Sequence, residues 1–291
     1  MTSPEPAAVR RLLRRVLPGE PRISRVDEGG DHATWLVGTG HVLRMARDID
    51  GTAGQRREIA LREAIRPHLA IAVPRSVAHG EWAPGLGYTL DTRLPGISAE
   101  KQAVSAAGEE DLAVLLTGLR SVPAATVDVP AAAARSLPEL TGEAVRAAVR
   151  LAEDGAAGPD LAHRLTGPLP PAAPATLLHH DLKGEHLLVT GAGRVSGVLD
   201  WTDAILGDPA EDVAGLVISV GAAAALRVAR LAGHGPELCA RALLLARCDT
   251  LTRLADRVYG TDDSPLPLLR AQLARAWETT PDLYRENPGR A

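Results

Sequence analysis

A short stretch around residue 181 holds the residues with the most evident chemistry in this sequence. His179 and Asp181 form a His-x-Asp pair, His186 stands at the fifth position after Asp181, and Asp200 follows the next apolar runs. This order is typical of phosphoryl transfer, in which the first aspartate accepts the proton of an attacking hydroxyl and the later residues hold Mg²⁺. We therefore expect Asp181 to act as the base and His186 and Asp200 to act as metal ligands.

The segment after this loop predicts the structure that brings the two aspartates together. Apolar residues at 187–189 and 195–199 flank a polar turn at 191–194. This pattern predicts a β-hairpin. Because Asp181 precedes the hairpin and Asp200 ends it, both carboxylates are expected in one cleft.

A zinc site is the alternative interpretation of the same loop. His179, His180, Asp181 and His186 are all side chains that ligate zinc. They are crowded on one loop, however, and neither a His-x-x-x-His helix nor a pair of nearby cysteines accompanies them. The phosphoryl-transfer interpretation is therefore favoured.

The elements before this loop predict a small β-rich lobe. Apolar periodicity indicates a first helix at 7–17 and a second, rich in Arg and Glu, at 53–69. Strands are expected at 22–27, 33–37, 41–46, 73–79 and 87–91. The chain would leave this lobe through a hinge at about 91–96, where Thr92, Arg93 and Leu94 would present backbone groups to a purine.

Beyond residue 100 the pattern is mainly helical. Helices are expected at 109–121, 139–154, 209–230, 236–258 and 265–278, with a Pro- and Ala-rich loop at 167–175. We therefore predict an α+β, bilobal protein-kinase-like fold. Its nucleotide-binding lobe would span residues 1–95, and its catalytic and acceptor-binding lobe would span residues 97–291.

Two features of the first lobe suggest nucleotide binding. Gly29 and Gly30 lie between two expected strands, where they would form either a phosphate-covering hairpin or an ordinary turn. Arg44, on the third strand, stands where a kinase places its phosphate-binding lysine, and Glu58, with Glu63 as second choice, would be its partner. A Gly-x-x-x-x-Gly-Lys-Ser/Thr motif is absent, which excludes a P-loop kinase.

Bulk composition narrows the class of protein. The chain has 291 residues and a formal net charge of −4, which argues against a nucleic-acid partner. Cys239 and Cys248 lie in an apolar helical segment and are expected to be buried thiols in a reducing compartment. Neither a signal-peptide pattern nor an apolar run of membrane-spanning length is present. These features predict a cytoplasmic protein with no membrane partner.

Taken together, these motifs resemble the aminoglycoside phosphotransferase family of antibiotic kinases. The resemblance rests on Val-Leu-Arg at 42–44, the loop at 179–189, Leu-Asp-Trp-Thr-Asp-Ala at 199–204 and Gly-Asp-Pro at 207–209. It implies ATP or GTP and Mg²⁺ as cofactors and an antibiotic hydroxyl as acceptor. It also implies Asp181 as base, Asp200 as metal ligand and Arg44 with Glu58 as the phosphate-positioning pair.

Two positions in the loop bear on this resemblance. His186 stands where aminoglycoside kinases carry Asn, and in this it is similar to the macrolide phosphotransferases. Because Mg²⁺ prefers oxygen ligands, His186 leaves the metal preference open. Lys183 resembles a kinase lysine that contacts the γ-phosphate and stabilises charge in the transition state, and a solvated surface lysine is the alternative.

The acceptor is expected to be a small molecule, because Asp208-Pro209 follows Asp200 too closely to leave room for a peptide-docking loop. A polycationic acceptor would use carboxylates, for which several candidates exist; they are Asp203, Asp208, Glu211, Asp249, Asp256, Asp262 and Asp263. Asp208 and Asp212 are instead expected to brace the catalytic loop. The alternatives to an antibiotic kinase are a small-metabolite kinase and a catalytically weak nucleotide-binding pseudokinase.

Overall fold

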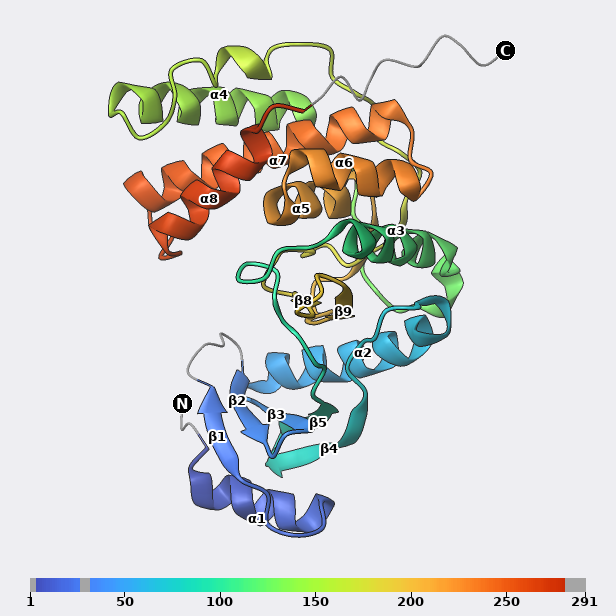
Figure 1. Ribbon diagram of the computed structural model, residues 1–291. Coiled ribbons are helices and arrows are strands. Elements are labelled where there is room, and N and C mark those ends of the chain that lie inside the picture. Colours follow the sequence, from blue (N-terminus) through green and yellow to red (C-terminus); the bar gives the residue numbers. More distant parts are fainter. Residues whose placement is uncertain (1–3, 27–31, 281–291) are drawn as a thin grey trace.

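The computed structural model describes residues 4–26 and 32–280, which form two lobes stacked one on the other (Figure 1). The N-terminal lobe contains a β-sheet, and the C-terminal lobe is mainly helical. The predicted α+β, bilobal kinase-like fold is therefore confirmed. Gly29 and Gly30 lie outside the described residues.

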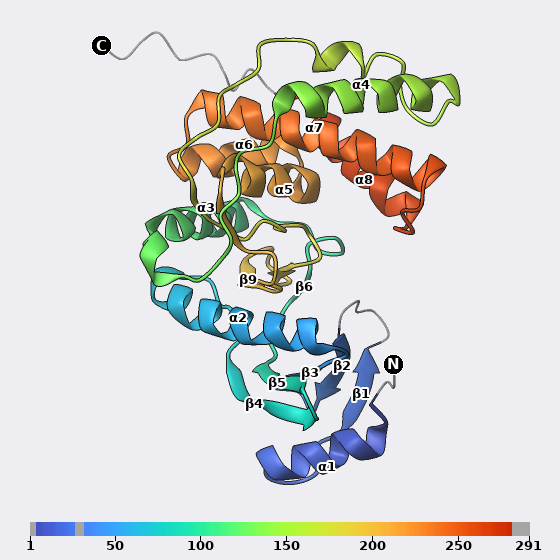
Figure 2. The same ribbon diagram turned by 180° about the vertical axis from the view of Figure 1, so that it is seen from behind.

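The N-terminal lobe is built on a five-stranded antiparallel sheet in the order β1-β2-β3-β5-β4. Its strands are β1 (Ile23–Val26), β2 (His32–Val37), β3 (His41–Ala46), β4 (Ser76–Ala83) and β5 (Leu86–Thr92). Helix α1 (Pro6–Val16) covers one face and α2 (Ile49–Ile65) covers the other (Figures 1 and 2). The apolar stripe of α1 is buried against alternate residues of the sheet, as the period of two in β2 requires.

Helix α2 differs from its predicted span at both ends. It begins after Asp48, whose side chain accepts a hydrogen bond from Gly51 N at 2.7 Å and so caps the helix. It ends at Ile65, and Pro67 lies in the short 3₁₀ turn Arg66–His68. The predicted span of 53–69 missed this cap, because two glycines, Gly51 and Gly54, lie within the first two turns of the helix.

The C-terminal lobe packs its helices around one large aliphatic core. The helices are α3 (Ala106–Ser121), α4 (Leu137–Glu153), α5 (Ala210–Val220), α6 (Ala222–Leu231), α7 (Pro236–Tyr259) and α8 (Leu266–Trp277), with short 3₁₀ turns at Ala124–Thr126 and His163–Leu165. The single helix predicted at 209–230 is wrong. Gly221 adopts a positive φ of 95° and divides it into α5 and α6.

Two small sheets carry the loop that contains Asp181. Strands β6 (Ile97–Ser98), β8 (Leu187–Val189) and β9 (Val195–Val198) form one of them, and β7 (Thr176–Leu178) pairs with β10 (Ile205–Gly207) in the other. The predicted hairpin is confirmed as β8 and β9. Strands β6, β7 and β10 were not predicted, because runs of two or three residues carry no measurable periodicity.

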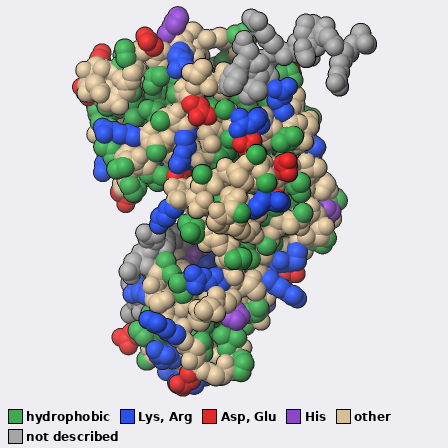
Figure 3. All heavy atoms as spheres, in the orientation of Figure 1, with side chains coloured by type: hydrophobic (Ala, Val, Ile, Leu, Met, Phe, Trp, Pro, Cys, Tyr) green, Lys and Arg blue, Asp and Glu red, His purple; other side chains and the backbone are tan. Residues whose placement is uncertain are grey.

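Both cysteines are free and buried, as predicted. Within residues 4–26 and 32–280, the longest apolar helices fall short of what crossing a bilayer requires. On the face shown in Figure 3, acidic and basic side chains are interspersed with hydrophobic ones.

Candidate active site

The loop from His179 to His186 connects β7 to β8, and buried groups hold its backbone in an unusual conformation. His180 has a positive φ of 66°, which a residue other than glycine adopts only when its surroundings compensate. The compensation comes from Asp212 on α5, whose carboxylate accepts hydrogen bonds from His179 N at 2.9 Å and His180 N at 2.7 Å. Asp212 therefore braces the loop, as predicted.

Asp208 does not contact this loop, contrary to the prediction. Its carboxylate is buried, forms an ion pair with Arg241, and accepts hydrogen bonds from Ala210 N at 3.1 Å and Ala173 N at 3.5 Å. It therefore fastens the start of α5 and the segment that leads into β7. The prediction gave Asp208 and Asp212 the same role because they are close in sequence, but Asp212 points to the loop and Asp208 points to Arg241.

His179 is buried inside the loop and has a structural role. Its Nε2 lies 2.8 Å from Leu199 O, and its Nδ1 accepts a hydrogen bond from Asp181 N at 3.3 Å. Trp201 packs edge-on against its ring at 4.6 Å. Burial lowers the pKa of His179 to about 4, so the ring is neutral. Because both nitrogens are engaged, His179 has no lone pair for a metal, which removes one ligand of the alternative zinc site.

Asp181 projects from the loop as a half-buried carboxylate beside Lys183. The ammonium of Lys183 forms an ion pair with Asp181 Oδ1, and His186 Nδ1 lies 3.4 Å from Asp181 Oδ2. Lys183 is therefore not an isolated surface lysine. It contacts the carboxylate that the sequence predicts to be the base.

His186 and Asp200 face each other after the loop. His186 Nδ1 lies 2.8 Å from Asp181 O, and since a carbonyl only accepts, Nδ1 carries the hydrogen. The other nitrogen, Nε2, is 3.8 Å from Asp200 Oδ2 and offers its lone pair when the ring is neutral. An imidazole nitrogen beside a half-exposed carboxylate is a donor set that fits a divalent cation.

The Asp200 carboxylate is held in the ionised form that metal binding requires. Burial raises its pKa, but hydrogen bonding by Thr202 and the positive charge of Arg44 lower it by more, to a net value below the ordinary one. Asp200 also has a positive φ of 56°. Strain of this kind clusters at functional sites, where the surrounding structure maintains it.

Glu185 was missed by the sequence reasoning. Its carboxylate, Asp181 and His186 each offer a ligand atom, and these atoms lie within 4.8 Å of one another. The neighbouring position of Glu185 and His186 was the available signal. The side chain is exposed, however, and exposed carboxylates commonly lie close together without a ligand.

Arg44 forms the expected pair across the N-terminal lobe. Its Nη2 donates to Glu58 Oε2 at 2.5 Å, joining β3 to α2. Glu63, the second candidate, contacts Arg66 at 3.2 Å instead. Glu58 is 2% exposed, so its attraction to Arg44 is screened less by water than that of a surface ion pair.

The three hinge residues differ in whether their backbone N–H groups are already hydrogen-bonded within the protein. Thr92 N donates to Arg75 O and Arg93 N donates to Gly40 O, both at 2.8 Å. Within residues 4–26 and 32–280, no hydrogen bond is recorded from Leu94 N. Of the three predicted purine contacts, Leu94 therefore has the N–H group that remains available to a base edge.

These groups meet in one cavity of about 420 Å³ between the lobes. One part of its wall is apolar, formed by Leu36, Val42, Pro74, Leu94, Leu188 and Leu199. Its charged and titratable lining residues include Arg44, Glu58, Arg62, Asp91, His186 and Asp200. Asp181 and Lys183 do not line the cavity but lie beside it. Asp181 contacts His186, which lines the cavity, and Lys183 contacts Asp181. The arrangement suits a planar apolar group joined to an anionic tail.

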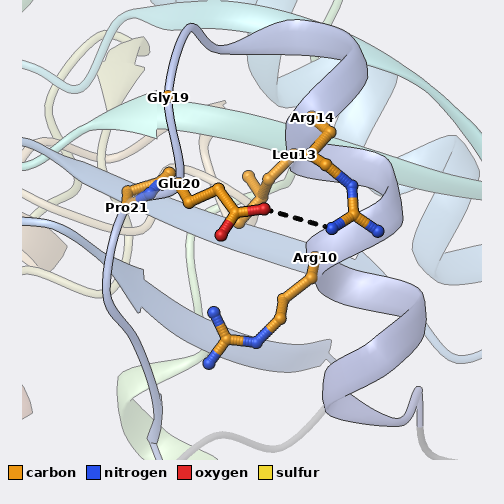
Figure 4. A pocket seen from close by; sticks show the side chains of 6 residues that line it. All are labelled: Arg10, Leu13, Arg14, Gly19, Glu20 and Pro21. Atoms are coloured by element: carbon orange, nitrogen blue, oxygen red, sulfur yellow. Dashed lines mark hydrogen bonds and ion pairs between the residues drawn. The ribbon is translucent and has the colours of Figure 1, made fainter.

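Smaller hollows also lie elsewhere in the described part of the chain. The one beside α1, lined by Arg10, Leu13, Arg14 and the turn at 19–21, has a volume of about 10 Å³ (Figure 4). Arg14 and Glu20 are joined there by an ion pair of 3.3 Å. A hollow of this size holds a water molecule and no organic ligand.

Several carboxylates proposed for the acceptor are already neutralised by arginines. Glu211 and Asp249 both bind Arg135, at 2.5 and 2.7 Å, and buried Asp208 binds Arg241. Asp203 differs: burial, and then the charges of Asp181 and Asp200, raise its pKa. Of these four acids, Asp203 is the one that adds negative potential beside the candidate base.

Comparisons with known proteins show which family this chain is related to. A family model described as the phosphotransferase enzyme family matches residues 22–245. Viomycin phosphotransferase from Streptomyces vinaceus is 30% identical over 243 residues, which cover 77% of this chain and 83% of that protein.

Solved structures show the same fold at lower identity. The GDP complex of aminoglycoside 2'-phosphotransferase-IIIa has a TM-score of 0.67 and 18% identity, over 90% of this chain and 96% of that one. The macrolide 2'-phosphotransferase from Brachybacterium faecium has a TM-score of 0.63 and 21% identity, over 94% and 99% of the two chains.

Proposed function

The chain belongs to the phosphotransferase enzyme family, and from this we propose that it transfers the γ-phosphate of ATP or GTP to a hydroxyl group of an antibiotic. The observation that carries the proposal is the cleft between the lobes. It places the Arg44–Glu58 pair on one wall and the His186–Asp200 pair on the other. An apolar pocket for the purine adjoins these charged groups, so the nucleotide would extend from Leu94 towards Asp200.

Each residue then has a definite task. Arg44 binds the phosphates, and Glu58 holds its guanidinium in place. Asp200 and His186 Nε2 hold Mg²⁺, which when bound neutralises charge on the transferred group. Asp181 orients the acceptor hydroxyl and takes its proton. Lys183, which pairs with Asp181, would contact the incoming phosphoryl group and stabilise its charge.

The acceptor is expected to be cationic. Asp203, Asp181 and Asp200 give one side of the site a concentration of negative charge; the pKa of Asp203 is raised by burial first and then by the other two carboxylates. The 30% identity to a viomycin phosphotransferase makes viomycin the first acceptor to try. The solved structures add kanamycin, streptomycin, gentamicin and a macrolide to the set.

The test is nucleoside-diphosphate release from ATP and from GTP, with Mg²⁺, in the presence of each candidate acceptor. The panel contains these antibiotics, choline and simple sugars, and Asp181→Asn is the blank. Release that one antibiotic class stimulates strongly, and that the blank lacks, supports the proposal and identifies the acceptor. Stimulation by choline or a sugar alone would make the protein a metabolite kinase. Nucleotide binding without stimulation by any acceptor would favour the pseudokinase.

A further inference from the structure

Arg62 is a buried cation that the functions assigned above do not use. It lies on α2, one turn after Glu58, and is 1% exposed. Its Nη2 donates to Asp91 Oδ1 at 3.2 Å, and its Nη1 lies 3.9 Å from Glu58 Oε1. A guanidinium is almost never fully buried unless carboxylates compensate its charge, and here two of them do.

Both carboxylates that contact Arg62 also contact Arg44. Glu58 Oε2 accepts from Arg44 Nη2 at 2.5 Å, and Asp91 Oδ2 lies 3.3 Å from Arg44 Nε. The four groups therefore form a closed ring of alternating charge in the order Arg44, Glu58, Arg62 and Asp91, which we call the charge ring. Its formal charges cancel, although it lies in the wall of the cavity that is to receive an anion.

The charge ring leaves one nitrogen of Arg44 for a ligand. Nη2 and Nε face the two carboxylates, whereas no interaction of Nη1 is recorded with any residue that the structure describes. Arg44 is also held from both sides, so its guanidinium plane has little freedom. A cation fixed in this way loses less conformational entropy when a phosphate binds.

Without Arg62, the same wall would carry one cation between two carboxylates. Its net charge would be −1, and Arg44 alone would have to compensate both acids. Either effect opposes the binding of a nucleoside triphosphate. The charge of Arg62 is therefore what allows an arginine flanked by two acids to act as a phosphate-binding group.

We propose that Arg62 and Asp91 are positioning residues for nucleotide binding: through the charge ring they hold Arg44 with Nη1 free, and Arg62 cancels the second carboxylate. This inference rests on the proposed function. Asp91 lies directly before hinge residue Thr92 and accepts a hydrogen bond from Thr89 Oγ1 at 3.0 Å. The ring thus connects the strand that reaches the purine to the group that binds the phosphates.

The experiment is calorimetric titration of ATP and of GTP, each with Mg²⁺, into the wild type, Arg62→Met and Arg62→Met/Asp91→Asn. The single variant should raise the Kd by about tenfold or more, because it leaves an uncompensated negative charge in the wall. The double variant restores a neutral wall with the Arg44–Glu58 pair intact, and it should recover most of the affinity. Steady-state kinetics should show the same pattern in the KM for nucleotide, with kcat changing less.

Controls separate the charge ring from general damage. Arg56→Gln removes another arginine of α2, one that is exposed and lies 3.9 Å from Glu81, and it should leave the Kd unchanged. If Arg62→Met does not fold, Arg62→Gln, which retains a hydrogen-bonding group beside Asp91, takes its place with the same expected rescue by Asp91→Asn. A single variant that binds like the wild type, or a double variant as weak as the single, would overturn the inference. A wild type that binds no nucleotide would refute the proposed function itself.

Discussion

Glu58 and Trp201 connect the two walls of the cleft through a single hydrogen bond. Trp201 N donates to Glu58 Oε1 at 3.3 Å, while the other oxygen of Glu58 binds Arg44. Trp201 directly follows Asp200, so α2 of the N-terminal lobe is fastened to the backbone that carries a candidate metal ligand. A change at Glu58 should therefore affect phosphate binding and metal binding together.

Asp181→Asn should abolish turnover and leave nucleotide binding intact. The amide cannot accept the proton of a hydroxyl, and loss of a general base lowers rates by about 10²- to 10⁴-fold. Diphosphate release with the stimulating acceptor measures the loss, and nucleotide titration checks the fold of the site. Asp128→Asn, which changes an exposed aspartate outside the candidate acceptor carboxylates, is the matched control. Unchanged turnover in Asp181→Asn would remove Asp181 as the base.

His186→Asn should retain or improve activity with Mg²⁺. The lone pair that His186 offers is that of Nε2, and an amide oxygen there suits a hard cation better than imidazole does. The measurement is turnover against Mg²⁺ concentration for both proteins, with Mn²⁺ as the comparison metal. An inactive variant that still binds nucleotide and metal normally would show that His186 does something other than ligate.

Asp212 and His179 should make opposite contributions to the pH dependence of stability. Burial raises the pKa of Asp212 from 3.8 to about 7, so below that pH the fold retains a proton that the unfolded chain releases. Its contribution to stability is therefore present at low pH and lost as the pH rises towards 7. Burial lowers the pKa of His179 from 6.5 to about 4, so its contribution is present above 6.5 and lost as the pH falls towards 4.

Removing either group should expose the contribution of the other. Between about pH 4 and 6.5, the free energy of unfolding of Asp212→Asn should rise with pH relative to the wild type, and that of His179→Gln should fall. Each slope has an upper limit of about 1.4 kcal/mol per pH unit. Urea unfolding at half-unit steps of pH measures both. Curves of the two variants that run parallel to the wild type would contradict the assigned pKa values.

Gly215→Ala should destabilise the protein although alanine favours helices. A Cβ at this position of α5 would lie 2.9 Å from Leu182 O, and Leu182 directly follows Asp181. Gly142→Ala on α4 is the matched control, because its Cβ would meet Arg146 Nη1 at an ordinary 3.5 Å. The control should raise the free energy of unfolding by up to about 1 kcal/mol. Gly215→Ala should lower both the free energy of unfolding and kcat. Equal stabilisation by Gly215→Ala and Gly142→Ala would show that the loop around Leu182 shifts without cost to accept the Cβ.

The features that could be predicted from the sequence are those formed by residues close together in the chain. Asp181, His186 and Asp200 lie within one loop and hairpin, so their spacing is sufficient to indicate one cleft. Arg44 was predicted because a kinase-like strand order places its third strand beside the nucleotide. The helix spans followed from apolar periodicity, and their errors arose at caps and breaks such as Asp48 and Gly221, where a single residue decides the outcome.

Only the tertiary structure determined which charged groups, far apart in the sequence, contact each other. The signals for Arg62 and Asp91 were faint: an arginine among apolar positions of α2, and an acid at the end of an apolar strand. Their burial in one ring depends on how α2 packs against β5. Likewise, Asp212 reaches the loop, and Asp208 does not, because of the direction of each side chain on α5 and before it. Local patterns encode which elements form, but the pairing of buried charges is settled only when those elements pack and water is excluded.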